Sequence, residues 1–365
     1  MEKIKICAKK IVQDVCKIKE GERVLIVTNR VFKDSVADTD EISKALHEEC
    51  ENVGAKVVTI VQPVKTSLDN AEPEVIAALK TEPDVFFSIS ENKLGKDCLG
   101  LQTPYIAEDG SSYDHIFDYL LYGKKSMRAV WTPGITLDMF SRTVDIDYEL
   151  LQSRCQTLCS KYENAESVHV TAPAGTDIIV PVMGRKAFVD DGCFDAGGTG
   201  GNIPAGEVFI SPVVGDGKEK GCSGRIVFDG SITLNEGDLV IKEPICVEVR
   251  GGFVTEITGG TEAEKLLQTI TSAEESAEKM DSKEYKRNAR NIGELGIGLN
   301  PEAQITGNML EDEKAFKTCH FAIGANYDGD APALIHLDGV VRNPTITINY
   351  SDGSQTKILD KGILL

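Results

Sequence analysis

Residues 20–27 read EGERVLIV, a turn signal followed by a four-residue apolar run. Apolar residues at helical spacing between positions 4 and 15 predict a helix before this run, and residues 38–53 predict a helix after it. The same alternation continues, with predicted strands at 56–62, 84–88 and 128–132 and a helix near 72–81. Strands that alternate with helices need crossover connections, which favour a mostly parallel sheet. We therefore expect an α/β N-terminal domain.

The sequence changes character near residue 164, after a helix predicted over 146–162. Short β-rich runs separated by Gly, Pro and Asp follow, at 168–171, 177–182, 225–228, 238–249 and 253–257. One helix is expected over roughly 262–291. A chain of 365 residues has the length of about two domains. The pattern predicts an α/β domain over 1–164 and a strand-rich α+β domain over 165–365.

Composition narrows the possible partners and the compartment. The chain has 39 Lys+Arg against 58 Asp+Glu, a formal net charge of −19, which argues against binding to nucleic acid or to an anionic membrane surface. No apolar stretch has the length of a signal sequence or a membrane span. The ten cysteines are scattered without a CxxC pair, as expected for free thiols in a reducing compartment. We expect a cytoplasmic protein.

Two familiar motifs, GxGxxG and HExxH, are incomplete in this sequence. The run GGTGG at 197–201 lacks the third glycine of GxGxxG, because Ile203 stands there, so it predicts a close backbone approach and not a phosphate loop. His47-Glu48 begins like HExxH, but Glu51 stands where the second histidine would be.

Metal-competent side chains gather near the C-terminus. Period-2 alternation in a strand places His336 and Asp338 on one face, as a metal site requires, although a surface strand with two outward polar residues gives the same pattern. His320 lies in an apolar strand context, where a lone histidine is more often a hydrogen-bonded core residue than a ligand. Upstream, Glu207 and Glu294 each stand alone in an apolar, Gly-rich stretch.

Buried carboxylates need positive partners, because an unpaired buried charge costs several kcal/mol. The basic residues in this region, Lys314, Lys317 and Arg342, are expected to be solvated. The sequence therefore predicts that a bound metal balances Glu207 and Glu294.

Four motifs carry a family resemblance: GNIPAGEVFISP, NIGELGIGLNP, EDEKAFKTCHFAIGANY and IHLDGVVRNPTI, at 201–212, 291–301, 311–327 and 335–346. In this order they resemble the aminopeptidase T/aminopeptidase S family of two-metal peptidases. The match covers the second domain and extends weakly into the first. The resemblance implies six metal ligands, namely Glu207, Glu294, His320, Tyr327, His336 and Asp338.

The resemblance implies a cytosolic leucyl aminopeptidase-like hydrolase acting on peptides or related small molecules. Two divalent ions (Zn, Co or Mn) would activate a water molecule by lowering its pKa. Glu313 is the candidate general base, and Tyr327 could ligate or donate a hydrogen bond to the oxyanion. The resemblance also suggests a homodimer.

Two alternatives remain open. The segment Glu311-Asp312-Glu313-Lys314 and the chain length are similar to a divergent branch of the family that includes 2,5-dihydroxypyridine dioxygenase-like enzymes. In that branch His320, His336 and Asp338 could hold a single Fe(II), with Glu207 and Glu294 as supporting contacts. The third possibility is a non-catalytic, metal-stabilised binding protein.

Overall fold

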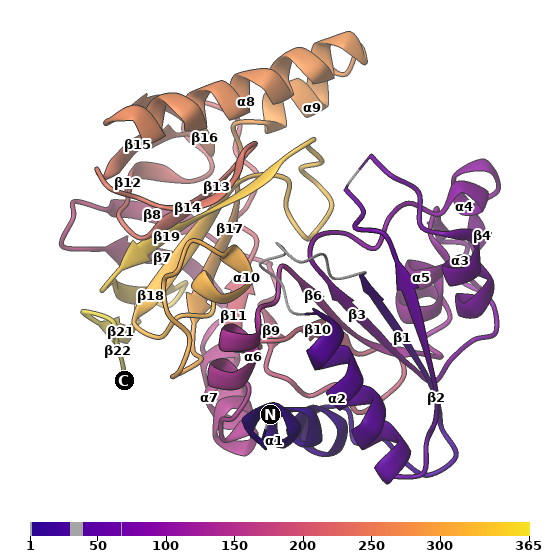
Figure 1. Cartoon of the computed structure of the whole chain (residues 1–365). Coiled ribbons are helices and arrows are strands. Elements are labelled where there is room, and N and C mark those ends of the chain that lie inside the picture. Colours follow the sequence, from indigo (N-terminus) through magenta and orange to yellow (C-terminus); the bar gives the residue numbers. More distant parts are fainter. Residues whose placement is uncertain (1, 30–38, 67) are drawn as a thin grey trace. The chain divides into compact units, whose positions relative to one another are not determined.

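The computed structural model describes residues 2–29, 39–66 and 68–365 (Figure 1). The chain forms two compact units, one of Met1–Gln152 and Asp190–Ala205 and the other of Ser153–Val189 and Gly206–Leu365. This division differs from a single boundary near residue 164, because residues 190–205 return to the first unit. The reason is strand pairing: within this return, β10 (Gly200–Asn202) adds to the sheet of the first unit beside β6.

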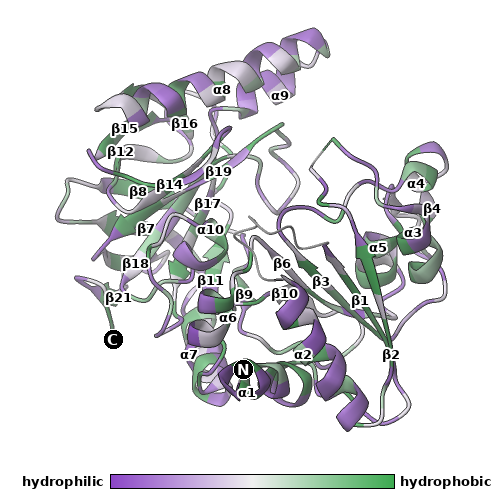
Figure 2. Cartoon of the chain, in the orientation of Figure 1, coloured by the Kyte–Doolittle hydropathy of each residue, from purple (hydrophilic) through white to green (hydrophobic). Residues whose placement is uncertain are grey.

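The first unit is built on a five-stranded sheet in the order β10-β6-β3-β1-β2, and its strand pairs are parallel. The other strands are β1 (Arg23–Asn29), β2 (Lys56–Gln62), β3 (Val85–Ser90) and β6 (Arg128–Pro133). The predicted parallel sheet is thus confirmed. Hydrophobic residues run along β1 and β3, where each strand is buried over nearly its whole length (Figure 2).

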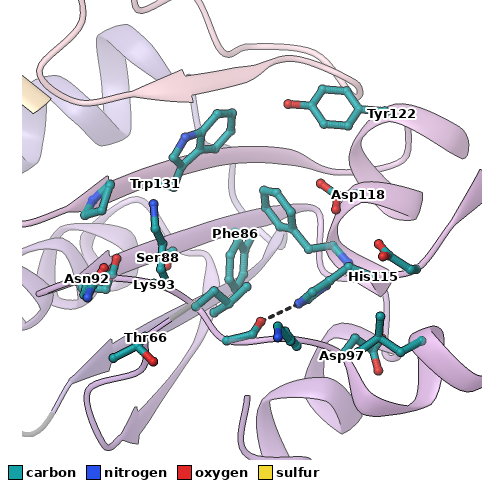
Figure 3. A pocket seen from close by; sticks show the side chains of 18 residues that line it. Thr66, Phe86, Ser88, Asn92, Lys93, Asp97, His115, Asp118, Tyr122 and Trp131 are labelled. Atoms are coloured by element: carbon teal, nitrogen blue, oxygen red, sulfur yellow. Dashed lines mark hydrogen bonds between the residues drawn. The ribbon is translucent and has the colours of Figure 1, made fainter. Parts of the chain in front are cut away.

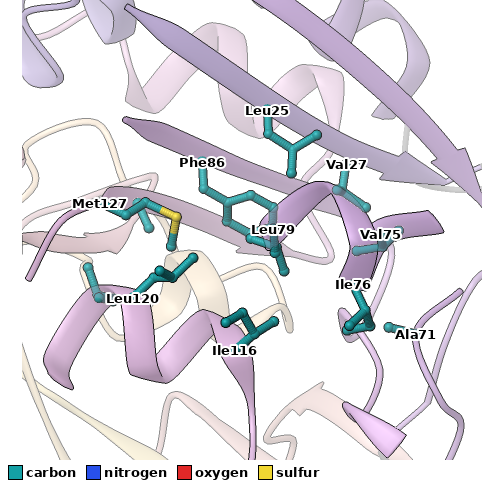
Figure 4. Close-up of a cluster of buried hydrophobic side chains, with 12 residues drawn as sticks. Leu25, Val27, Ala71, Val75, Ile76, Leu79, Phe86, Ile116, Leu120 and Met127 are labelled. Carbon is teal, nitrogen blue, oxygen red and sulfur yellow. The ribbon is translucent and has the colours of Figure 1, made fainter. Parts of the chain in front are cut away.

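Helices cover both faces of this sheet (Figure 1). The helices of this unit are α1 (Glu2–Lys10), η1 (Ile11–Val15), α2 (Thr39–Asn52), α3 (Pro73–Leu79), α4 (Cys98–Gln102), α5 (Ile116–Asp118), η2 (Tyr119–Gly123), α6 (Leu137–Thr143) and the start of α7 (Tyr148–Lys161). On one face, Phe86 of β3 packs among Leu79 of α3 and Leu120 of η2 (Figure 4). The segment 96–112, which shows no period in sequence, contains α4 and most of a small hairpin of β4 (Tyr105–Ile106) and β5 (Ser112–Tyr113).

The second unit contains two sheets. The seven-stranded sheet has the order β14-β13-β19-β18-β17-β11-β9, and the eight-stranded sheet has the order β16-β15-β12-β8-β7-β20-β21-β22. In the first sheet the strands are β9 (Phe188–Asp190), β11 (Glu207–Ile210), β13 (Ser231–Leu234), β14 (Gly237–Val240), β17 (Ile292–Gly298), β18 (Thr318–Gly324) and β19 (His336–Arg342). In the second they are β7 (Ala165–Thr171), β8 (Asp177–Pro181), β12 (Ser223–Phe228), β15 (Ile245–Arg250), β16 (Phe253–Thr258), β20 (Thr345–Tyr350), β21 (Gln355–Asp360) and β22 (Ile363–Leu364).

The helix expected over 262–291 is two helices, α8 (Thr261–Lys279) and α9 (Lys283–Asn288). The break falls at Asp281, whose φ of 54° is incompatible with a continuing right-handed helix. Ser282 then caps α9 by accepting a hydrogen bond from the Tyr285 backbone N–H. None of the described helices is both long and apolar enough to cross a bilayer.

Candidate metal centre

The candidate site lies on one face of the central strands of the seven-stranded sheet, all within the second unit. Strands β17, β18 and β19 are antiparallel neighbours, and their register places Glu294 opposite Ala322 and Ala322 opposite Asp338. Directly opposed residues share a face of a sheet, so both carboxylates project on the same side. Glu207, on β11, is opposite Gly298 of β17 and joins that face.

Two glycines of β17 make room for the imidazole of His320 and for a loop that crosses the strand. His320 is opposite Gly296, and a Cβ at 296 would lie 2.0 Å from Nε2 of His320. A Cβ at Gly298 would lie 2.2 Å from the carbonyl oxygen of Ala315. The loop that follows α10 (Met309–Asp312) can therefore cross close over β17.

The side chains form one continuous buried cluster. Nε2 of His320 lies 3.1 Å from Glu294 Oε1 and 3.4 Å from Glu207 Oε2. Nε2 of His336 lies 3.3 Å from the other Glu294 oxygen and 3.4 Å from Asp338 Oδ1. Glu294 therefore connects the two histidines. Two neighbouring sets of donors, with no residue in common, can each hold a metal ion: Glu207, Glu313 and His320 form one, and Glu294, His336 and Asp338 form the other.

The donors fit a metal ion in chemistry and in orientation. His336 Nδ1 donates to the carbonyl oxygen of Ala325 at 2.9 Å, which leaves the Nε2 lone pair directed at the carboxylates. Glu294 Oε2 and Asp338 Oδ1 are buried, and within the described ranges they form no other polar contact than those with Nε2 of His336, at 3.3 and 3.4 Å. Buried carboxylate oxygens that face the same imidazole nitrogen can accept a cation there.

The prediction that Lys314 is solvated is wrong. Its side chain is 0% exposed. Its Nζ lies 2.9 Å from Glu207 Oε1 and is also hydrogen-bonded to Glu313. One of the two donor sets therefore already contains a protein cation. The prediction failed because Glu311 and Asp312, its neighbours in a charged run, suggest a surface loop. Both are in fact buried acceptors of backbone amides in 304–307.

The buried charges of the cluster shift the pKa values of its imidazoles and of Glu313. Burial disfavours a charged His320, but its hydrogen bond to Glu294 and the nearby carboxylates raise its pKa to about 9. The pKa of His336 is likewise raised, chiefly by Asp338 and Glu294 acting against burial. Burial, reinforced by the charges of Glu207 and Asp338, raises the pKa of Glu313 to about 8, although Lys314 opposes the shift. Without a metal, these raised pKa values favour the cationic, doubly protonated form of both imidazoles.

The structure places Tyr327 at the edge of the cluster, not inside it. Its ring contacts His336 with centroids 5.3 Å apart and Phe209 with centroids 4.9 Å apart, and 60% of the residue is exposed. Phe188 continues the row by stacking on Phe209 at 5.5 Å. Sequence reasoning did not find Phe209, Gly296 or Lys314. The pattern Glu-Leu-Gly-Ile-Gly at 294–298 was the available signal, because glycines at alternate strand positions indicate a close approach on one face.

Comparison with known proteins identifies the family to which this chain belongs. The model of the 2,5-dihydroxypyridine 5,6-dioxygenase family matches residues 136–364, well over half of the chain and every residue of the cluster. The chain belongs to this family. A curated relative, 2,5-dihydroxypyridine 5,6-dioxygenase of Pseudomonas putida KT2440, is 29% identical over 204 residues. The aligned part spans about half of each protein, 51% of this chain and 52% of the relative.

Two solved structures share the fold. 2,5-Dihydroxypyridine dioxygenase from Pseudomonas putida KT2440 superposes with a TM-score of 0.70 at 19% identity, over 99% of this chain and 96% of that one. Wild-type AmpT from Thermus thermophilus gives 0.65 at 15% identity, over 100% and 99%. At these identities the likeness shows the fold, an α/β unit with a parallel sheet joined to a strand-rich unit, as predicted.

The expected function is corrected by the family match. The leading interpretation as an aminopeptidase, a hydrolase, is wrong, because the chain belongs to a dioxygenase family. The divergent branch considered as an alternative is the supported one. The motifs that suggested a peptidase do build a buried cluster of acids and imidazoles, but the sequence analysis did not recognise that Lys314 is buried within it.

Replacing Gly296 by Ala tests the room that glycine leaves for His320. The added methyl group must displace the imidazole, and we expect the affinity for a divalent metal to fall by about 10–100-fold, the usual effect of disturbing a ligand's support. The measurement is metal content after equilibrium dialysis. Ile297→Val, on the opposite face of β17, should cost about 0.5–1.5 kcal/mol of stability and leave metal binding intact. Normal metal affinity in the Gly296→Ala variant would contradict the assignment of His320.

Metal binding should also depend on pH with a definite sign. Because the pKa values of both imidazoles are raised without metal, a binding metal must displace their protons, and apparent affinity should increase with pH up to about 9. The expected slope is at least tenfold per pH unit between about pH 6 and 8, with release of up to about two protons per ion. Titration calorimetry with Mn²⁺ in buffers of different ionisation enthalpy measures both quantities. A flat affinity over this range would show that the imidazoles are not ligands.

Proposed function

We propose that this protein is a mononuclear Fe(II) dioxygenase that opens the ring of 2,5-dihydroxypyridine or a close analogue. Membership of the dioxygenase family carries the proposal. Two features of the cluster support it. The cluster contains the two imidazoles and one carboxylate typical of Fe(II) oxygenases: His336 and Asp338 share one donor set, and Glu294 connects His336 to His320 of the other set. Lys314 supplies the positive charge that a second metal would otherwise bring.

The cluster balances its charge with one divalent ion. At neutral pH without metal, the three carboxylates of Glu207, Glu294 and Asp338 face the ammonium of Lys314 and two imidazoliums. Glu313, whose pKa is about 8, is mostly protonated under these conditions. One divalent ion that displaces the two imidazolium protons leaves this balance unchanged. A second ion would add two uncompensated charges in a buried site.

When bound, Fe(II) with open coordination positions supplies the one-electron chemistry that lets O₂ react with an electron-rich ring. The protein's own groups would hold and orient the reactants. Ala325 fixes the tautomer of His336, and Glu294 orients both imidazoles. Glu313 is our candidate for proton transfer with a substrate hydroxyl, because a carboxyl group with a pKa near 8 can both accept and release a proton near neutral pH.

An aromatic row beside the metal ligands supports a planar substrate. Phe188, Phe209 and Tyr327 follow one another at centroid distances of 5.5 and 4.9 Å, and the last ring meets His336. Such rings present apolar faces and edges against which a pyridine ring can pack. Tyr327 would then contact the substrate from the edge of the site, which replaces its expected role as a metal ligand with a positioning role.

Oxygen uptake tests the proposal directly. Fe(II)-loaded protein given 2,5-dihydroxypyridine should consume one O₂ per substrate molecule, with loss of the pyridine absorbance. Asp338→Asn removes a charged ligand and should lower turnover by at least about 100-fold, together with iron content. Asp330→Asn, a half-exposed aspartate paired with Arg185, is the matched control and should keep normal turnover. Absence of O₂ uptake by iron-loaded wild type, or full activity of Asp338→Asn, would refute the proposal.

A further inference from the structure

A cavity separate from the metal-competent cluster lies entirely within the first unit (Figure 3). Its volume is about 500 Å³, and it opens at the carboxyl ends of β3 and β6, where Ser90 and Pro133 line it. In parallel sheets this is the end at which ligands bind. Every lining residue belongs to the first unit, whereas the metal-competent cluster belongs to the second.

Three aromatic rings form its walls. Phe86 and Phe117 meet with centroids 5.4 Å apart at 58°, and Phe117 meets Trp131 at 5.8 Å and 88°. The cavity therefore presents ring edges and faces against which the flat, apolar part of a small ligand can pack. The glycine run at 197–201 includes the start of β10, which pairs with β6 next to Trp131. A Cβ at Gly200 would lie 2.5 Å from the carbonyl oxygen of Ala129 and 3.1 Å from Cζ3 of Trp131, so glycine lets β10 pair closely with β6 at the indole.

The polar side chains that line the cavity differ in whether they already form hydrogen bonds with other protein groups. Asp97 accepts hydrogen bonds from three backbone amides and from the Tyr105 hydroxyl. His115 uses both ring nitrogens, accepting from the Phe117 amide and donating to the carbonyl oxygen of Gly95. These two residues therefore hold the walls in place and are not free to recognise a ligand.

Asp118 is different. It is half-buried at the end of α5, and in Figure 3 its carboxylate lies between Tyr122 and His115. Within the described ranges it makes no hydrogen bond or ion pair, and burial raises its pKa although His115 opposes the shift. The lysines that line the cavity, Lys93 and Lys96, are exposed. A carboxylate in an aromatic pocket is matched by a cationic donor that can also contact ring faces.

We propose that this pocket binds a planar aromatic molecule that carries a cationic nitrogen group, such as an amidinium or aminopyridinium. The ring packs among Phe86, Phe117 and Trp131, and the nitrogen group donates to Asp118. The proposal does not rest on the metal centre, because neither its residues nor its test involve metal or turnover.

The sequence supplies a specific reporter. Trp131 is the one tryptophan of the chain, so intrinsic tryptophan fluorescence reports on this pocket alone. Titrating the full-length protein with benzamidine should change this fluorescence saturably, whereas benzoate, which has the same ring but the opposite charge, should not. Asp118→Asn should weaken benzamidine binding at least about tenfold, since a charge-assisted hydrogen bond is lost. Asp109→Asn, an exposed aspartate outside the pocket, should bind as wild type.

Calorimetry and a second variant keep the test decisive. If Asp118→Asn does not fold, as judged by its melting curve, Phe117→Leu removes an aromatic wall and should weaken benzamidine binding several-fold with the carboxylate intact. Benzoate binding as tightly as benzamidine, unchanged benzamidine affinity in Asp118→Asn, or no saturable binding of benzamidine to wild type by calorimetry would each overturn the proposal.

Discussion

Charge balance within the buried acid cluster of the second unit is the constraint on which the site depends. Glu207 and Glu294 are 6% and 3% exposed, and carboxylates this deeply buried persist only beside positive charge. The protein supplies one such charge permanently, through Lys314, and two reversibly, through His320 and His336. Our proposal of one divalent ion rests on this division of charge, whereas the strand motifs alone first suggested two ions.

The backbone geometry of the sheet makes this cluster possible. Four neighbouring strands present their polar residues on one face, while glycines at alternate positions of β17 leave space for an imidazole and for the loop that carries Lys314. The opposite face of β18, with Cys319, Phe321 and Ile323, is buried and apolar. Rigid strands therefore hold the donors, as a site with demanding geometry requires.

Much of the architecture could be predicted from local pattern. The strand at 56–62 and the parallel sheet follow from apolar runs that alternate with helical periodicity, and both are present. Period-2 alternation also placed His336 and Asp338 on one face, as the register shows. The break between α8 and α9 was missed because it depends on a positive φ at Asp281, which an aspartate does not announce in sequence. The burial of Lys314 was missed because it depends on long-range packing over Gly298.

We propose that the site holds one metal ion and not two, and counting metal ions tests this most directly. Protein purified and loaded with Fe(II) under anaerobic conditions, then freed of unbound metal, should contain about one ion per chain by elemental analysis, because Lys314 already provides the second cation. Two tightly bound divalent ions per chain would contradict the account.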